Sequence, residues 1–183
     1  MSVVKLLKEV EFLENYGGDT HIELIDGVVV RYERGGTKSA FVACNFSCNL
    51  ARFVDERELG WVAINDTFVR VRTHPIRIRC ADVLYLRYSR WPADAGLTDG
   101  PMPATPELIV EMKTAAISWM GIFEKVTDYL GAGTRVVLVI DTHTDSVHAF
   151  RSDTAPQVFA TDAELTIPDV LPGFGVPVAS LFK

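Results

Sequence analysis

The spacing of apolar residues predicts two helices in the first third of the chain. Within residues 3–15, apolar side chains recur at helical spacing. Those that fall near one stripe are Val4, Leu6, Leu7, Val10 and Leu13. Gly17-Gly18 follows and ends this helix, because glycine is common just beyond a helix. A longer helix is expected over residues 38–58, closed by Gly60.

Alternation of apolar and polar residues predicts strands around these helices. Residues 21–32 (HIELIDGVVVRY) form a predicted hairpin, because Asp26-Gly27 favours a tight turn between two strands. Short strands are then expected from WVAIN, FVRVR and PIRIRCADVLYLR, at residues 61–65, 68–72 and 75–87.

Two continuous apolar runs in the second half of the chain predict buried strands, PELIVEMK at 106–113 and RVVLVID at 135–141. Residues 90–105 are rich in Pro, Gly, Ala and Asp, which indicates an exposed loop. A helix is expected over 117–130, and SVHAFRS at 146–152 should pair with the second buried strand as a hairpin. A last turn of helix is expected in the tail.

Together these elements predict a single domain over residues 1–183, with an α/β fold in which helices flank a mixed sheet. A chain of this length can bury a hydrophobic core without the help of a disulfide or a metal. The two apolar runs place Val110, Val137 and Val139 at the centre of that core.

Composition indicates a soluble, cytoplasmic protein. Apolar residues make up 48% and charged residues 23%, as in ordinary globular proteins. No apolar run approaches the roughly 20 residues of a membrane-spanning helix, and charges such as Lys5 and Glu9 interrupt the N-terminal segment where a signal peptide would be apolar. Three cysteines, an odd number, argue against a disulfide framework. Cys44 and Cys48 are expected to be reduced and buried.

The net charge of −6 and the isoelectric point of about 5.2 count against a protein that coats nucleic acid, because such proteins usually carry a basic field. They do not exclude a nuclease, which concentrates carboxylates to hold metal and binds its substrate only transiently.

Candidate chemistry begins with Glu111 and Lys113. Residues two apart on a strand point to the same face, and a buried strand should not carry unpaired charges there. The pair is either a surface ion pair at a strand end, or a metal-binding carboxylate beside a lysine that handles water. Asp82, at a strand start, favours the second interpretation if its strand neighbours the other. Two carboxylates and the Met112 carbonyl would suit Mg²⁺ or Mn²⁺.

Several segments resemble known motifs in order along the whole chain. Ala81-Asp82 with Glu111-Met112-Lys113 resembles the PD-(D/E)xK signature of restriction-endonuclease-like nucleases. Further segments are similar to those of the bacterial endonuclease-like family called Uma-two: residues 23–27 (ELIDG), 79–83 (RCADV), 106–113 (PELIVEMK), 125–133 with its Lys125-x-x-x-Tyr129-x-x-x-Gly133 spacing, and 171–174 (LPGF). Ala81 in place of proline and Ser39 in place of a frequent histidine are departures from that pattern.

The resemblance implies a restriction-endonuclease-like fold and metal-dependent hydrolysis of DNA phosphodiesters. Asp82 and Glu111 would hold the ion with Met112, and Lys113 would orient or deprotonate the attacking water. Glu23 resembles an extra acidic residue that this superfamily brings from an earlier element, and it is otherwise a surface charge of the hairpin.

Basic residues suggest how DNA could bind. Arg70, Arg72, Arg77 and Arg79 would line one face if their strands pair, and such a ridge could meet a phosphate backbone. The same pattern also fits the solvated face of a half-buried hairpin. Lys125 either faces the carboxylates and the nucleic acid or simply packs.

Three functions therefore remain. The first is an Mg²⁺- or Mn²⁺-dependent DNA endonuclease, and the second is a non-catalytic nucleic-acid- or protein-binding module on the same fold, which the acidic charge favours. The third is a structural dimer with surface ion pairs, which predicts no binding of divalent metal. The expected partners are DNA, inferred from the resemblance, and a second copy in a homodimer; no membrane is expected.

Overall fold

The computed structural model describes residues 5–33, 35–97 and 99–183 of the chain. Its helices are α1 (Glu9–Tyr16), α2 (Thr37–Asp55), α3 (Trp119–Gly131) and α4 (Val178–Leu181), with a short 3-10 turn at Ala93–Ala95. Its strands are β1 (Ile22–Ile25), β2 (Val28–Arg31), β3 (Gly60–Thr73), β4 (Ile76–Arg87), β5 (Leu108–Lys113), β6 (Val136–Asp141), β7 (Ser146–Arg151), β8 (Thr154–Phe159), β9 (Glu164–Thr166) and β10 (Gly175–Pro177). In the described part of the chain, no helix is long and apolar enough to cross a lipid bilayer.

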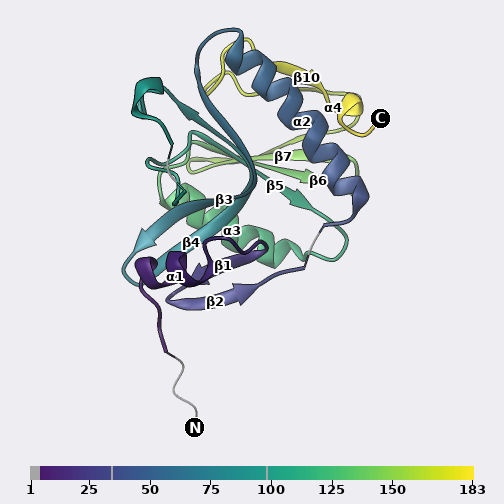
Figure 1. Cartoon of the computed structure of the whole chain (residues 1–183). Helices are drawn as coiled ribbons and strands as arrows, with labels where there is room; N and C mark the ends of the chain where they lie inside the picture. Colours follow the sequence, from purple (N-terminus) through teal and green to yellow (C-terminus); the bar gives the residue numbers. More distant parts are fainter. Residues whose placement is uncertain (1–4, 34, 98) are drawn as a thin grey trace.

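Among the described residues, β1 to β8 form one mixed sheet, and β9 and β10 pair separately. The main order is β2-β1-β4-β5-β6-β7-β8, with β3 paired to β4. The β5 and β6 strands run parallel, whereas β4 and β5 run antiparallel. In Figure 1, α2 and α4 lie over one face of the sheet and α3 over the other, while α1 lies beside β1. The predicted mixed sheet flanked by helices is therefore confirmed.

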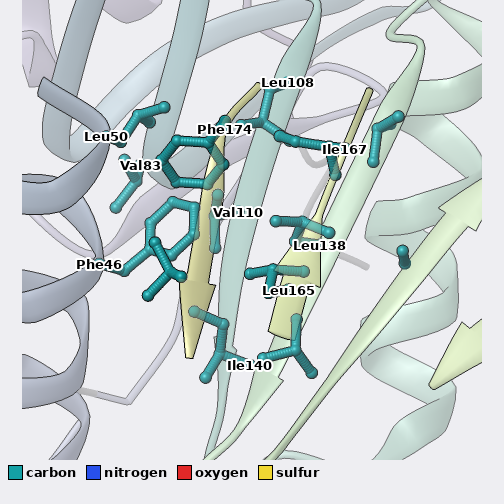
Figure 2. Close-up of a cluster of buried hydrophobic side chains, with 14 of the residues drawn as sticks. Phe46, Leu50, Val83, Leu108, Val110, Leu138, Ile140, Leu165, Ile167 and Phe174 are labelled. Carbon is teal, nitrogen blue, oxygen red and sulfur yellow. The ribbon is translucent and has the colours of Figure 1, made fainter. Parts of the chain in front are cut away.

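The alternating side chains of the central strands build a core on each face of the sheet. On the α2 side, the core combines Phe46 of α2 and Phe174 with four strand residues, Leu108, Val110, Leu138 and Ile140 (Figure 2). Ile109, Val137 and Val139 point the other way and pack with residues of α3. Val110, Val137 and Val139 are fully buried, as expected from the two apolar runs.

The first helix differs from its prediction. It begins at Glu9 instead of residue 3, and residues 1–4 lie outside the described residues. Leu6 and Val10 are 62% and 64% exposed, while Phe12 is fully buried. The buried side of this short helix is centred on Phe12, whose ring meets that of Phe68 on β3 edge to face at 5.4 Å. The apolar stripe was therefore misplaced, because an eight-residue helix can bury only a few residues against the sheet.

Two other expectations need correction. Cys44 and Cys48 are free but exposed on α2, and only Cys80 is a buried cysteine among the described residues. The two strands expected at 61–65 and 68–72 are one strand, β3, which is interrupted by a bulge between Ile64 and Thr67. The hairpin with its turn at Asp26-Gly27 is confirmed, and both turn residues have positive φ, 54° and 83°.

Truncation of Val110 to alanine should lower the free energy of unfolding by about 2 kcal/mol, because it leaves a cavity between the sheet and α2. Val158→Ala is the matched control, since Val158 is also in a strand but is 57% exposed. Its effect should stay within about 0.5 kcal/mol. Denaturant unfolding followed by circular dichroism measures both variants, and equal losses would contradict the assignment of Val110 to the core.

Candidate active site

A cavity of about 360 Å³ opens where β1, β4 and β5 meet the first turns of α3. Each of these elements places a charged side chain in its wall: Glu23 from β1, Asp82 from β4, Glu111 from β5 and Lys125 from α3. The cavity therefore collects residues from distant parts of the sequence, and three of the four carry carboxylates.

Asp82 and Glu111 are brought together by the register of β4 and β5. Val83 pairs with Val110 in this antiparallel ladder, so Asp82 and Glu111 occupy the next positions along it. There the carboxylate of Asp82 accepts a hydrogen bond from the backbone N–H of Met112 at 2.6 Å. Burial raises the pKa of Asp82, although Lys125 and the Met112 N–H oppose that rise.

Glu111 is a buried carboxylate with two donors. Its Oε2 accepts a hydrogen bond from Lys125 Nζ at 2.6 Å, and its Oε1 accepts one from the Tyr129 hydroxyl at 2.8 Å. Burial raises the pKa of Glu111 to about 8; the Lys125 ammonium opposes this rise and the negative charge of Asp82 adds to it. The pKa of the buried Glu111 carboxyl group therefore lies close to neutral pH.

Lys125 is surrounded by oxygen atoms. Besides Glu111, its ammonium donates to the carbonyl of Cys80 at 3.0 Å and lies 3.3 Å from Glu23 Oε1. Burial by itself lowers the pKa of Lys125, but the charges of Glu111, Glu23 and Asp82 outweigh it and raise that pKa. Lys125 therefore stays a cation. Tyr129 lies one helical turn further along α3, so that both side chains reach the same carboxylate.

Glu23 is buried, and both of its carboxylate oxygens accept hydrogen bonds. Its Oε2 accepts a hydrogen bond from Arg79 at 2.6 Å, and its Oε1 accepts the backbone N–H of Cys80 at 3.2 Å. Arg79 is in turn paired with Asp128 of α3 at 2.6 Å. With both oxygens occupied, Glu23 is placed to hold Lys125.

Lys113 lies outside the cavity. Its ammonium is 3.2 Å from Asp141 Oδ2 on β6 and 5.2 Å from the centre of the Trp119 ring. In the parallel register, Lys113 is the direct partner of Asp141, so its charge is satisfied across the strands instead of along its own strand. The lysine beside Glu111 is Lys125, which the E-x-K spacing does not identify.

The arginine face expected on β3 and β4 is formed only in part, because Arg72 pairs directly with Arg77 and shares a face with Arg79, whereas Arg70 lies on the other face. Arg70 pairs with Ile78 and contacts Glu9 of α1, whereas Arg79 pairs with Val69 and contacts Asp128 of α3. Because a second bulge falls between Arg70 and Arg72, the alternation expected from the sequence is broken. Each of the four arginines, Arg70, Arg72, Arg77 and Arg79, is paired with a carboxylate.

Sequence analysis missed two residues at the rim of the cavity, Tyr32 and Asp66. They are joined by a hydrogen bond of 2.7 Å from the Tyr32 hydroxyl to Asp66 Oδ1. The ring of Tyr32 also lies 5.3 Å from Lys125 Nζ. No local pattern indicates these contacts, because the bonded residues are 34 positions apart.

The donor set at the cavity suits a hard divalent cation. Asp82 and Glu111 offer carboxylate oxygens, which Mg²⁺ and Mn²⁺ prefer. Among the described residues, no group of three or more His, Cys, Asp or Glu side chains is arranged as a metal cage. Mg²⁺ is commonly held by one or two carboxylates together with water and substrate phosphates, so that the two carboxylates and a main-chain carbonyl such as that of Met112 fit this mode.

The comparisons with known proteins found one matching family model and a solved structure with the same fold. A family model described as "Uma2: Putative restriction endonuclease" matches residues 9–179. Among curated proteins, none matches the chain. A crystal structure from Anabaena variabilis, described as "a putative nuclease belonging to DUF820", has the same fold, with a TM-score of 0.82 and 16% identity. The similarity covers 96% of this chain and 97% of that chain.

The raised pKa of Glu111 has a consequence for the metal-free protein. A carboxyl group whose pKa is higher in the folded state stabilises the fold at low pH, and this contribution is lost as the pH rises from about 4.3 through about 8. In the presence of a chelator, Glu111→Gln should therefore gain stability relative to the wild type across this range, by a few kcal/mol, because each pKa unit corresponds to about 1.4 kcal/mol. Chemical unfolding at several pH values measures the difference.

Glu14→Gln is the matched control, since Glu14 is an exposed residue of α1. Its unfolding free energy should run parallel to that of the wild type. If the Glu111→Gln profile is also parallel, Glu111 titrates as an ordinary exposed carboxyl group and the described burial is wrong.

Proposed function

Since the chain belongs to the Uma2 family, we propose that it is a metal-dependent endonuclease that hydrolyses phosphodiester bonds of DNA. The observation that carries the proposal is the meeting of Asp82 and Glu111 on neighbouring strands, with the Lys125 ammonium 2.6 Å from Glu111 in one cavity. A phosphodiester repels an attacking nucleophile, so a catalyst for its hydrolysis must concentrate positive charge, and two carboxylates can do so only by holding a cation.

Asp82 and Glu111, with the main-chain carbonyl of Met112, would hold Mg²⁺ or Mn²⁺. The bound ion would neutralise phosphate charge and lower the pKa of water. The hydrogen bond from the Met112 N–H fixes one oxygen of Asp82, and the Tyr129 hydroxyl fixes one oxygen of Glu111. Both carboxylates are therefore oriented before any ligand arrives, which reduces the cost of reorganisation during reaction.

Lys125 takes the role that the sequence motif assigns to Lys113. Because its pKa is raised by the surrounding carboxylates, Lys125 holds its proton and is a poor general base. It orients the attacking water and stabilises the negative charge that develops on the phosphate. Glu23 and the Cys80 carbonyl also hold its ammonium in place.

One observation favours a second candidate, a binding module without catalysis on the same fold. The arginines that could have met a phosphate backbone are paired with carboxylates, and the chain has a net charge of −6. An endonuclease of this kind should bind DNA weakly and with strong salt dependence. A module that binds protein would need no cation at the cavity.

Cleavage of DNA by matched variants separates these functions. The wild type, with Mg²⁺ or Mn²⁺ at low salt, should cut at least one of supercoiled, linear, branched and single-stranded DNA. Asp82→Asn, Glu111→Gln and Lys125→Met should each lower the rate on the order of 100-fold or more, because each removes a group that acts on the reacting phosphate or its cation. Gel assays measure the rate, and calorimetry measures metal binding.

Lys113→Met is the control for Lys125→Met. It removes a buried ammonium that lies against Asp141, so it should lower stability while folded protein keeps its activity. Loss of activity in folded Lys113→Met but not in Lys125→Met would restore Lys113 as the catalytic lysine. A wild type that binds no divalent ion and cuts none of these substrates would replace the endonuclease with the binding module.

A further inference from the structure

A histidine that the motifs do not include, His21, lies at the junction of two cavities. The active-site cavity and a neighbouring one of about 330 Å³ beside α2 share His21, Asp66, Asp82 and Met112 in their walls. His21 therefore faces the same space as the carboxylate Asp82. Its side chain is 26% exposed, so it remains accessible from the cavity.

The backbone around this histidine is bent to an unusual degree. His21, Asn65 and Asp66 all have positive φ, 59°, 69° and 59°, a conformation that side chains other than glycine rarely adopt. Asn65 and Asp66 form the bulge of β3, between Ile64 and Thr67. Without the bulge, β3 would continue its regular alternation past this point. The two distorted segments meet at one contact, between His21 and Asp66.

Asp66 holds the histidine from the backbone and from the ring. Its Oδ2 accepts the backbone N–H of His21 at 3.2 Å and lies 3.1 Å from Nδ1 of the ring. Its Oδ1 accepts the Tyr32 hydroxyl at 2.7 Å, and the Tyr32 ring meets the imidazole edge to face at 5.5 Å. The ring of His21 is thus fixed by a carboxylate on one side and an aromatic ring on another.

A carboxylate beside Nδ1 determines which ring nitrogen can exchange a proton. It favours the proton on Nδ1, so Nε2 is left for a ligand in the cavity. Within the described chain, no group donates to or accepts from Nε2. A residue that only joined the start of β1 to β3 would not need an imidazole ring at the cavity wall.

We propose that His21, oriented by Asp66, is the general acid of the phosphodiester cleavage, and this rests on the proposed function. Water attacks phosphorus, forms a new P–O bond and releases a proton to solvent, while the bond from phosphorus to the leaving oxygen breaks. The Nε2 proton of the His21 imidazolium passes to that leaving oxygen, which departs as an alcohol. Solvent then returns a proton to His21, so that the atoms and charges balance.

The neighbouring lysine cannot easily serve this purpose. Lys125 is held by Glu111, Glu23 and the Cys80 carbonyl, and these carboxylates make its proton harder to release. Tyr129 is bonded to Glu111 and to the Cys80 carbonyl, and burial raises its pKa. Among the described residues that line the two cavities, His21 supplies the imidazole, a side chain that can pass a proton to a leaving group.

The test compares substrates whose leaving groups differ in whether they must be protonated to depart. Oligonucleotides carry, at a linkage that the wild type cuts, either the natural oxygens or a sulfur in place of the bridging 3′ or 5′ oxygen. A thiolate leaves without protonation, so a variant that lacks the general acid should recover on one sulfur substrate. His21→Asn and Asp66→Asn are the variants, because asparagine tolerates the left-handed backbone at both positions. His143→Asn is the control at an exposed histidine.

His21→Asn should lower kcat on the natural linkage on the order of 100-fold and on one sulfur linkage only a few-fold. Its DNA affinity in Ca²⁺, measured by fluorescence anisotropy, should match the wild type. Asp66→Asn should show the same selective recovery after a smaller loss, and His143→Asn should behave as wild type.

Equal losses of His21→Asn on all three linkages, or no loss on any, would overturn the role of His21 and leave the proposed function standing. A wild type that cuts none of the linkages would overturn the proposed function, and the role of His21 with it.

Discussion

The contact between Lys125 and Glu111 is the interaction on which the arrangement of this protein depends. Glu111 is buried and the Lys125 side chain is only 16% exposed, so an unpaired charge in such a place would be strongly destabilising. Their pairing continues through a chain of alternating charges that joins β1, β4, β5 and α3: Glu111, Lys125, Glu23, Arg79, Asp128, Arg77 and Asp26. Because α3 contributes both Lys125 and Asp128, this network holds the helix at a defined rotation over the sheet. The chain ends at Glu111, which lies beside Asp82 of the neighbouring strand, and a further cation between these two carboxylates would be favourable.

The same network explains why an acidic protein can carry so many arginines on adjacent strands without a basic surface. Arg77 and Arg79 form ion pairs with carboxylates of the hairpin and of α3, and Arg79 is almost fully buried. Their energetic role is to neutralise Glu23, Asp26 and Asp128. In the proposed function, positive charge beside a phosphate would come from Lys125 and from the cation that Asp82 and Glu111 would hold.

Distortion of the backbone is concentrated where the cavity opens. The bulge at Asn65-Asp66 of β3 and the left-handed His21, which precedes β1, are far apart in the sequence, yet they meet at the rim. Such strained residues persist only where the surrounding structure holds them. On either side of the bulge, β3 stays paired to β4, so that the distortion remains local to the rim.

The sequence by itself determined those features that depend on neighbours along the chain. Local periodicity and turn chemistry determine the Asp26-Gly27 turn, the buried strands β5 and β6 and the helices around residues 38–58 and 117–130. The ordered motifs indicated the nuclease-like family.

Tertiary structure alone decided which charges meet. Lys113 is two residues from Glu111 but pairs with Asp141, while Lys125 reaches Glu111 from a helix. Arg70 is separated from the other three arginines because a bulge shifts the alternation of β3, and Cys44 and Cys48 are exposed because the helix turns them away from the sheet. Partners of buried charges are set by strand register and helix rotation, which arise from packing across the whole domain and leave no local pattern in the sequence.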